Sequence, residues 1–328
     1  LMRKATAFVH KSCWKNKFFD LSDWKINLNN CNYAGDLLRK KLREQGVDLA
    51  TPDINPPQEA EFILFYDRPK VNVSRLKGRK YLLMLESSLI RPDNWSGHED
   101  YDKIFTWDDN LVDGKRYIKF NYSLGPFPAG EKFRWEEKKL CTMVCSNKFK
   151  AHPQELYTER LNAIRWFEQF HPDEFDFYGS GWDRKRFKGI LRPFNRCPPV
   201  GRLMADAHPC YRGRAKRLDI LSRYKFAFSY ENIRGARGYI TEKIIACFLA
   251  GCIPIYWGAP NIDQYIPEPL FIDRGRFASY EQLYDFLKKM PAQEHQSRLE
   301  AIDQFLKSDR FYPFTPEGVV ETLIRHIL

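Results

Sequence analysis

The stretch from Tyr224 to Pro260 constrains the fold most, because it has the pattern of one strand–loop–helix–strand unit. Tyr224–Tyr230 alternates aromatic and apolar residues, as a buried strand does. A basic loop with two glycines follows, and from Ile240 apolar residues recur at helical spacing until Gly251. Cys252–Trp257 is a second apolar run of strand length. The stretch therefore predicts a βαβ unit, which belongs in a sheet covered by helices.

The loop of this unit delivers the N-terminus of a helix, which favours an anion such as phosphate. Lys243 would add a full positive charge in the first helical turn. Glu242 has the wrong charge for a phosphate, and we expect it to accept a hydrogen bond from a ribose hydroxyl. Asn232, at the end of the first strand, can both donate and accept. On spacing alone, a solvated first turn explains Glu242 and Lys243 equally well.

The positive charge of the chain is concentrated just before this unit. The net charge of the 328 residues is +11, and the segment from Asp183 to Lys225 holds 13 Lys or Arg against three Asp, a net of +10. Nucleic acid or a solvated basic face would explain such a segment. Because it leads directly into the predicted phosphate site, a nucleotide diphosphate or an anionic acceptor explains the segment as economically, and we expect no nucleic-acid partner. The candidate donor or loop contacts are Tyr211, Arg212, Lys216, Arg234 and Arg237.

The cysteines and acidic residues form no metal-ligand pattern. Four cysteines fall within predicted apolar strands or a helix, and we expect them to be buried free thiols: Cys141, Cys145, Cys247 and Cys252. Asp108 and Asp109 are adjacent, and neighbouring carboxylates on a turn point in different directions. We therefore predict no metal and no required cofactor, with a divalent cation at most stimulatory.

Strand and helix patterns alternate along the rest of the chain. In the N-terminal half we predict strands at 4–10, 60–66 and 81–85, a helix at 33–45 and a hairpin around Asp113-Gly114. In the C-terminal half we predict strands at 140–145, 175–178 and 270–273, and helices at 153–170, 279–289, 298–307 and from Thr315. A charged stretch at 133–139 marks the domain boundary. We therefore expect α/β domains at 1–138 and 139–328, facing across a cleft, with the last helix packing back on the first domain.

Composition and short motifs limit the class of protein and the cellular compartment in which it is expected. Hydrophobic residues make up 43% and charged residues 29%, a globular profile, and no stretch approaches the roughly 20 apolar residues of a membrane span. The first residues contain no apolar run of signal-peptide length, whereas N-x-S triplets at Asn72, Asn94 and Asn121 are compatible with a lumenal enzyme. We expect a cytoplasmic or membrane-peripheral enzyme of bacterial type; the alternative is a Golgi lumenal enzyme with an anchor upstream of this sequence.

Several motifs together resemble the α-1,3-fucosyltransferases of glycosyltransferase family 10. The donor motif of that family is matched by Glu231-Asn232, by Tyr239-Ile240-Thr241-Glu242-Lys243 and by the strand Ile253–Gly258. The resemblance extends through SNKF, the helix with Arg160, YGSGW, the YRG triplet and LESSLIRP, and covers about two thirds of the chain. One departure is a loop between Asn232 and Lys243 that is one residue longer than the family pattern.

The resemblance implies a GT-B fold of two Rossmann-like domains, GDP-fucose bound in the C-terminal half, and inversion at the anomeric carbon. By position, Glu86 matches the general base and Arg160 and Lys243 the diphosphate-binding residues. Glu242 matches the ribose contact, and Asn232 and Tyr239 match further donor contacts. Elementary chemistry agrees, because a base must take the acceptor proton. Fixed cations also stabilise a leaving diphosphate more in the transition state than in the ground state.

We therefore expect an inverting fucosyltransferase that moves L-fucose from GDP-fucose to a hydroxyl of a glycan. The implied linkage is α-1,3 to GlcNAc or Glc of a LacNAc- or lactose-type oligosaccharide or of a surface polysaccharide. The alternatives are a GT-B transferase with a different nucleotide sugar, and a non-catalytic glycan- or nucleic-acid-binding protein on the same fold. Trp24, Trp95 and Trp107 are candidates for stacking against a sugar ring of the acceptor, although a tryptophan more often packs in a core.

Overall fold

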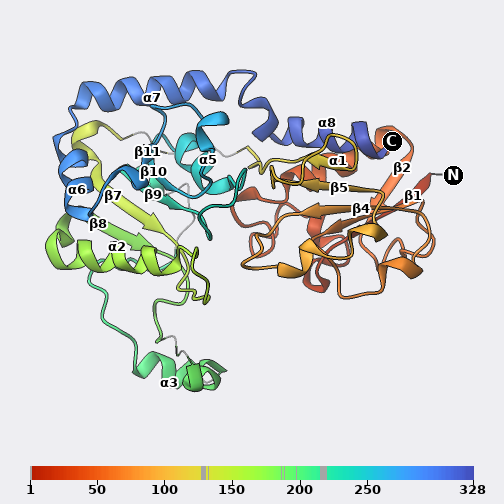
Figure 1. Ribbon diagram of the computed structural model, residues 1–328, viewed down its shortest axis with the longest axis horizontal. Helices are drawn as coiled ribbons and strands as arrows, with labels where there is room; N and C mark the ends of the chain where they lie inside the picture. Colours follow the sequence, from red (N-terminus) through yellow and green to blue (C-terminus); the bar gives the residue numbers. More distant parts are fainter. Residues whose placement is uncertain are drawn as a thin grey trace.

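The computed structural model describes residues 2–126, 131, 133–185, 187, 189–196, 198–214 and 220–328, with backbone alone at 192, 196, 198 and 202. It contains two parallel sheets, each covered by helices, that lie side by side along the longest axis of the molecule (Figure 1). The six strands of the first sheet precede residue 120, and the five strands of the second begin at Lys139. The predicted α/β class with two Rossmann-like units is confirmed.

The N-terminal sheet has the strand order β2-β1-β3-β4-β5-β6, and every neighbouring pair is parallel. Its elements are β1 (Arg3–Phe8), α1 (Tyr33–Glu44), β2 (Val47–Ala50), β3 (Phe62–Tyr66), β4 (Arg79–Met84), β5 (Lys103–Thr106) and β6 (Tyr117–Lys119). The predicted hairpin at Asp113-Gly114 is wrong. The Asp113 carboxylate accepts hydrogen bonds from the backbone N–H groups of Lys115, Arg116 and Tyr117, which closes a local turn, and β6 then pairs parallel to β5.

The C-terminal sheet has the order β11-β10-β9-β7-β8 and is also parallel throughout. Its strands are β7 (Lys139–Val144), β8 (Phe175–Tyr178), β9 (Tyr224–Tyr230), β10 (Ile253–Trp257) and β11 (Ile272–Asp273). The covering helices are α2 (Tyr157–Phe170), α5 (Glu242–Leu249), α6 (Tyr280–Lys289) and α7 (Ala292–Leu306). The four cysteines predicted to be buried thiols are buried and lie outside any disulfide: Cys141, Cys145, Cys247 and Cys252.

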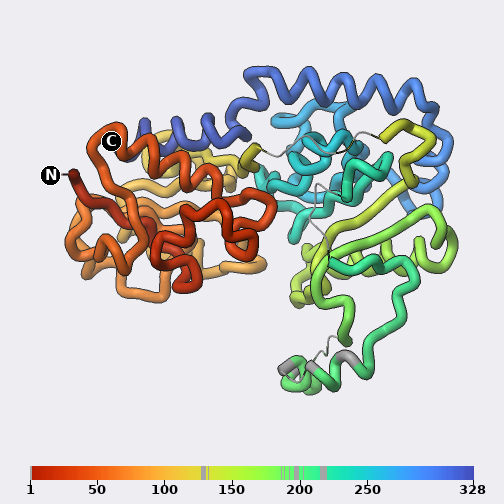
Figure 2. The backbone as a smooth tube through the Cα atoms, turned by 180° about the vertical axis from the view of Figure 1, so that it is seen from behind, coloured from red at the N-terminus to blue at the C-terminus, as the bar shows by residue number. Residues whose placement is uncertain are grey.

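The short helix α3 (Pro198–Leu203) lies on an excursion between β8 and β9 that stands apart from both sheets in Figures 1 and 2. Within the described ranges, no helix combines the length and the apolar character needed to cross a membrane.

The last helix, α8 (Pro316–Ile327), leaves the second sheet and covers the first. Thr315 caps its N-terminus by accepting a hydrogen bond from the N–H of Gly318 at 3.1 Å, and a proline follows at the first helical position. At its other end, Arg79 donates to the carbonyl of Ile327 at 2.7 Å. Figure 1 shows α8 beside α1, and the chain therefore crosses between the two units twice, before β7 and after α7.

Both sheets reverse their strand order at a comparable point, between β1 and β3 in the first and between β7 and β9 in the second. In open parallel sheets, ligands bind outside the carboxyl ends of the strands at such a switch point. The topology therefore offers two half-sites, one on each unit.

Candidate active site

A cavity of about 500 Å³ lies between the two units, at the carboxyl ends of both sheets. Its walls come from the segments that follow β3 and β4 on one side and β7 and β9 on the other, together with the starts of α1 and α5. Six of the residues proposed from the sequence line it: Glu86, Arg160, Asn232, Tyr239, Glu242 and Lys243. The two switch points therefore open into one shared space.

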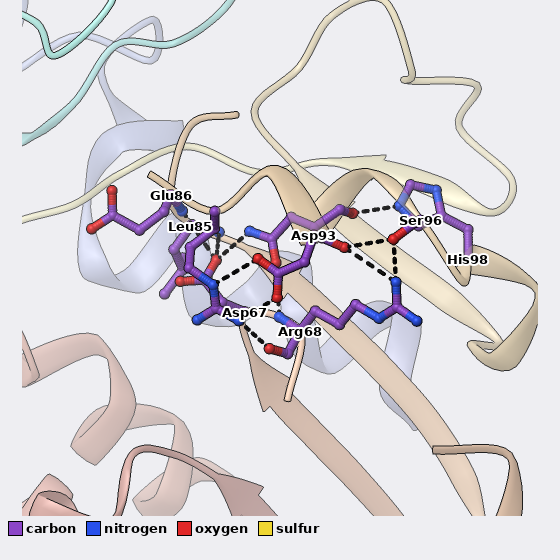
Figure 3. Close-up of polar contacts among 9 residues, drawn as sticks. Asp67, Arg68, Leu85, Glu86, Asp93, Ser96 and His98 are labelled. Carbon is purple, nitrogen blue, oxygen red and sulfur yellow. Dashed lines mark hydrogen bonds and ion pairs between the residues drawn. The ribbon is translucent and has the colours of Figure 1, made fainter. Parts of the chain in front are cut away.

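Glu86 follows β4 and has a half-buried side chain. Its backbone N–H donates to Oδ1 of Asp67 at 3.0 Å, and the N–H of Leu85 donates to the same oxygen at 2.8 Å. Figure 3 shows the Glu86 carboxylate pointing away from these bonds. The turn that carries Glu86 is thus fixed by its backbone, which leaves the carboxylate available to the cavity.

Asp67 directly follows β3 in the left-handed conformation, with φ +61°, and its side chain is buried. The fully buried Asn94 donates from Nδ2 to Oδ1 of Asp67 at 2.7 Å and accepts from the N–H of Arg68 at 2.7 Å. These bonds lock the ends of β3 and β4 together. They also occupy the Asn94 amide, so this N-x-S triplet offers no accessible glycosylation site in the folded chain.

The pKa of Glu86 is raised above its ordinary value. Burial is the main cause and the negative charge of Asp67 the second, while Lys243 and Lys148 act in the opposite direction. A carboxylate with a raised pKa is a stronger base and is better matched to proton abstraction near neutral pH. Lys148, which follows β7 and lines the cavity, had no role assigned from the sequence.

Arg160 is buried on α2 and binds the end of β9. Its Nη2 donates to the carbonyls of Tyr230 and Glu231, both at 2.7 Å, and to Oδ1 of Asn232 at 3.2 Å. Its guanidinium lies 5.0 Å from the centre of the Tyr157 ring. Arg160 therefore brings a positive charge to the cavity wall and orients the carboxamide of Asn232 at the same time.

Lys243 is held by the completely buried carboxylate of Glu231. Oε2 of Glu231 accepts from Nζ of Lys243 at 3.1 Å and from Oγ1 of Thr241 at 2.8 Å, and Oε1 accepts from the N–H of Thr241 at 2.8 Å. Glu231 thus joins the end of β9 to the start of α5 across the loop. The sequence contained a signal for this role, because Glu231 is a charged residue directly after an apolar strand. No function for Glu231 was predicted from that signal.

Tyr239 is buried where the loop meets the N-terminal unit. Its ring lies 4.6 Å from that of Trp107 and 6.0 Å from that of Tyr122, between ring centres. Burial raises the pKa of Tyr239 well above its usual value, so the phenol is neutral. Trp107 is 2% exposed and contacts Trp95 in the same cluster, which makes both packing residues, whereas Trp24 is exposed and does not line the cavity.

The loop between β9 and α5 docks on the N-terminal unit through Asp109. The carboxylate of Asp109 accepts from Nζ of Lys119 at 2.7 Å, from Nδ2 of Asn261 at 2.7 Å and from the hydroxyl of Tyr265 at 2.5 Å. Its N–H donates to the carbonyl of Arg237 at 3.3 Å. Asp109 is therefore an interdomain contact. Within the described part of the chain, no three His, Cys, Asp or Glu side chains form a group that could hold a metal ion.

Four of the remaining candidates, Tyr211, Arg212, Arg234 and Arg237, do not line the cavity. Arg234 and Arg237 are exposed, and Arg234 lies 5.6 Å from the Trp257 ring. At the end of β8, the hydroxyl of Tyr211 donates to the carbonyl of Gly179 at 2.7 Å, and Arg212 pairs with Asp176 at 2.8 Å. Lys216 lies outside the described residues.

Two Rossmann-like units that share a cavity at their switch points define a GT-B fold. A family model described as glycosyltransferase family 10 (fucosyltransferase), C-terminal part, matches residues 134–299, which is half of the chain. The chain belongs to glycosyltransferase family 10.

Known relatives and structures agree with this assignment. An alpha-(1,3)-fucosyltransferase of Helicobacter pylori is 37% identical over 70 residues, and a GDP-fucose protein O-fucosyltransferase 3 of Xenopus tropicalis is 38% identical over 72 residues. These matches cover 21% and 22% of this chain but only 14% and 15% of the relatives. A crystal structure of an alpha1,3-fucosyltransferase with GDP-fucose shares the fold, with a TM-score of 0.52 and 14% identity over 99% of this chain and 89% of that one.

Proposed function

We propose that this protein transfers L-fucose from GDP-fucose to a glycan hydroxyl with inversion at the anomeric carbon. One observation carries the proposal: a carboxylate on one unit, Glu86, and two fixed cations on the other, Arg160 and Lys243, line the same cavity. A base opposite a diphosphate clamp is what a single displacement requires. The relatives named for GDP-fucose and for fucose transfer support GDP-fucose as the sugar nucleotide.

In the proposed reaction, the acceptor oxygen attacks the anomeric carbon of fucose while the bond from that carbon to the β-phosphate oxygen breaks. Glu86 takes the acceptor proton, and GDP leaves with the bonding electrons. Negative charge grows on the leaving oxygen, where Arg160 and Lys243 stabilise it. Because Glu231 holds Lys243 before substrate arrives, little reorganisation is needed at that moment.

The donor contacts follow from the same arrangement. Glu242, at the start of α5, accepts from a ribose hydroxyl, and Asn232 and Tyr239 complete the donor wall. Fixed side-chain cations neutralise the diphosphate in place of a metal, so the proposed reaction requires none. On the acceptor side, we propose α-1,3 transfer to GlcNAc or Glc of an oligosaccharide or polysaccharide. The relative from Helicobacter pylori, which is named for that linkage, supports the α-1,3 part of this proposal.

Nucleotide specificity tests the donor directly. We expect GDP to raise the melting temperature and UDP, ADP and CMP to have little effect, because ligand binding to the native state alone stabilises it. GDP-fucose should then be consumed in the presence of lactose or N-acetyllactosamine. Stabilisation by UDP in place of GDP would contradict the donor assignment, and absence of both transfer and donor hydrolysis would contradict the activity.

A further inference from the structure

Lys148 brings a further positive charge to the cavity, beside those of Arg160 and Lys243. It lies in the segment that follows β7, next to the switch point between β7 and β9. The residue is exposed, and it forms no hydrogen bond or ion pair with any residue that the structure describes. Its ammonium is therefore a cation of the cavity wall that no protein group engages within the described chain.

The backbone that carries Lys148 is fixed by the two residues before it. The N–H of Asn147 donates to the carbonyl of Ser180 at 2.9 Å, and Nδ2 of Asn147 donates to the carbonyl of Gly181 at 3.1 Å. Oγ of Ser146 lies 2.8 Å from Oγ of Ser180. The turn after β8 thus holds this segment in place, and Lys148 extends into the cavity from an anchored position.

The charges of the other two cations are already balanced on the C-terminal unit. Lys243 lies 3.1 Å from the buried carboxylate of Glu231 and 3.7 Å from that of Glu242. Two carboxylates therefore oppose the two charges of Arg160 and Lys243, which weakens the attraction of this wall for an anion. Each phosphate of a sugar nucleotide carries a negative charge. Lys148 supplies the net positive charge that the wall otherwise lacks.

The position of Lys148 relative to Glu86 indicates which phosphate it can reach. Burial and then the charge of Asp67 raise the pKa of Glu86, and the positive charges of Lys243 and Lys148 oppose them. Lys148 therefore lies toward the part of the cavity that holds the base. In a nucleoside diphosphate sugar, the β-phosphate carries the sugar and is the phosphate nearer to the reacting carbon. The β-phosphate is thus the group that Lys148 faces.

We propose that the ammonium of Lys148 binds the β-phosphate of the donor and of the GDP product, as a third cation of the diphosphate clamp. This inference rests on the proposed function, because it assumes that GDP-fucose is the donor. Lysine suits the role, since it binds phosphate as a compact point charge. When the bond from the anomeric carbon to the β-phosphate oxygen breaks, Lys148 stabilises the negative charge that grows on that phosphate.

Lys148→Gln tests the contact, because it removes the charge from an exposed position and should not lower the melting temperature of the ligand-free protein. We expect the Kd for GDP to rise at least about tenfold. The Kd for GMP, which lacks the β-phosphate, should change by less than about threefold, because salt screens more distant charges. Lys148→Arg keeps the charge and should retain most of the GDP affinity.

Lys150→Gln is the matched control, because it removes the same charge from the next lysine of the segment, which is exposed and does not line the cavity. Its GDP affinity should equal that of the wild type. Unchanged GDP affinity in Lys148→Gln would overturn the inference, as would equal weakening of GDP and GMP or a rise in acceptor KM alone. If Lys243→Ala weakens GDP in the same experiment, the proposed function survives these outcomes. If the wild type does not bind GDP, the inference and the proposed function both fail.

Discussion

Glu231 and Lys243 form an ion pair at 3.1 Å, although eleven residues separate them in the sequence. The carboxylate is completely buried, whereas the ammonium faces the cavity with 18% of its side chain exposed. The pair therefore has one structural and one functional partner: Glu231 closes the loop between β9 and α5, and Lys243 is presented to the donor.

Glu231→Gln should disrupt both functions. The substitution replaces an acceptor oxygen by an N–H donor that faces Lys243, and it leaves Lys243 without its buried counter-charge. We expect the free energy of unfolding to fall by about 3 kcal/mol and GDP to bind more weakly. Glu268→Gln, at an exposed ion pair with Arg276, is the control and should change neither quantity. A Glu231→Gln protein with wild-type denaturation and GDP affinity would contradict the account.

Asp67→Asn should shift the acidic limb of the pH–rate profile to lower pH. Glu86 acts as a base only when ionised, so the rate falls as pH drops through its raised pKa. Removing the negative charge of Asp67 lowers that pKa, and the same rate is then kept to lower pH. Asparagine tolerates the φ of +61° and retains an acceptor oxygen for the N–H groups of Leu85 and Glu86. An unmoved limb, or one moved to higher pH, would contradict the role of Asp67.

Asp109→Ala should loosen the contact between the two units. The substitution removes the acceptor shared by Lys119, Asn261 and Tyr265 and leaves the half-buried Lys119 unpaired. We expect about 2–3 kcal/mol lower stability, measured by urea denaturation, against little change for the exposed Asp303→Ala.

The same contact should weaken in acid. Although desolvation opposes the shift, the hydrogen bonds from Lys119, Tyr265 and Asn261 lower the pKa of Asp109 below its ordinary value. Its contribution to stability is therefore present above the unfolded pKa of about 4 and is lost as pH falls below it. If acid destabilises the wild type and Asp109→Ala equally, protonation of the Asp109 carboxylate does not contribute to the loss of stability in acid.

Gly179→Ala should be far more damaging than Gly114→Ala. A Cβ at position 179 would lie 1.8 Å from the carbonyl oxygen of Cys145, with φ at +143°, whereas at position 114 the φ is +71° and no atom lies within 4 Å. We expect a loss of more than about 3 kcal/mol at Gly179 and about 1 kcal/mol at Gly114. Equal melting temperatures for the two variants would show that the turn after β8 does not require the close approach of Gly179 to the carbonyl oxygen of Cys145.

The sequence predicted the positions of strands and helices best where the local hydrophobic periodicity was strong. The unit β9–α5–β10 was placed to within two residues, because its strand and helix patterns do not depend on distant contacts. The strands β2 and β5 were missed, since each has only four residues and no clear alternation. The roles of Asp67 and Asp109 were also missed, because each depends on partners that only the folded chain brings together.

The central claim is that Glu86 removes the acceptor proton and does not bind the donor. Steady-state transfer of fucose from GDP-fucose, measured together with the Kd for GDP, tests it in the single substitution Glu86→Gln. We predict a fall in kcat of about 10²- to 10⁴-fold, with GDP affinity unchanged. Transfer that persists at the wild-type rate, or a loss of GDP binding that parallels the loss of transfer, would contradict the account.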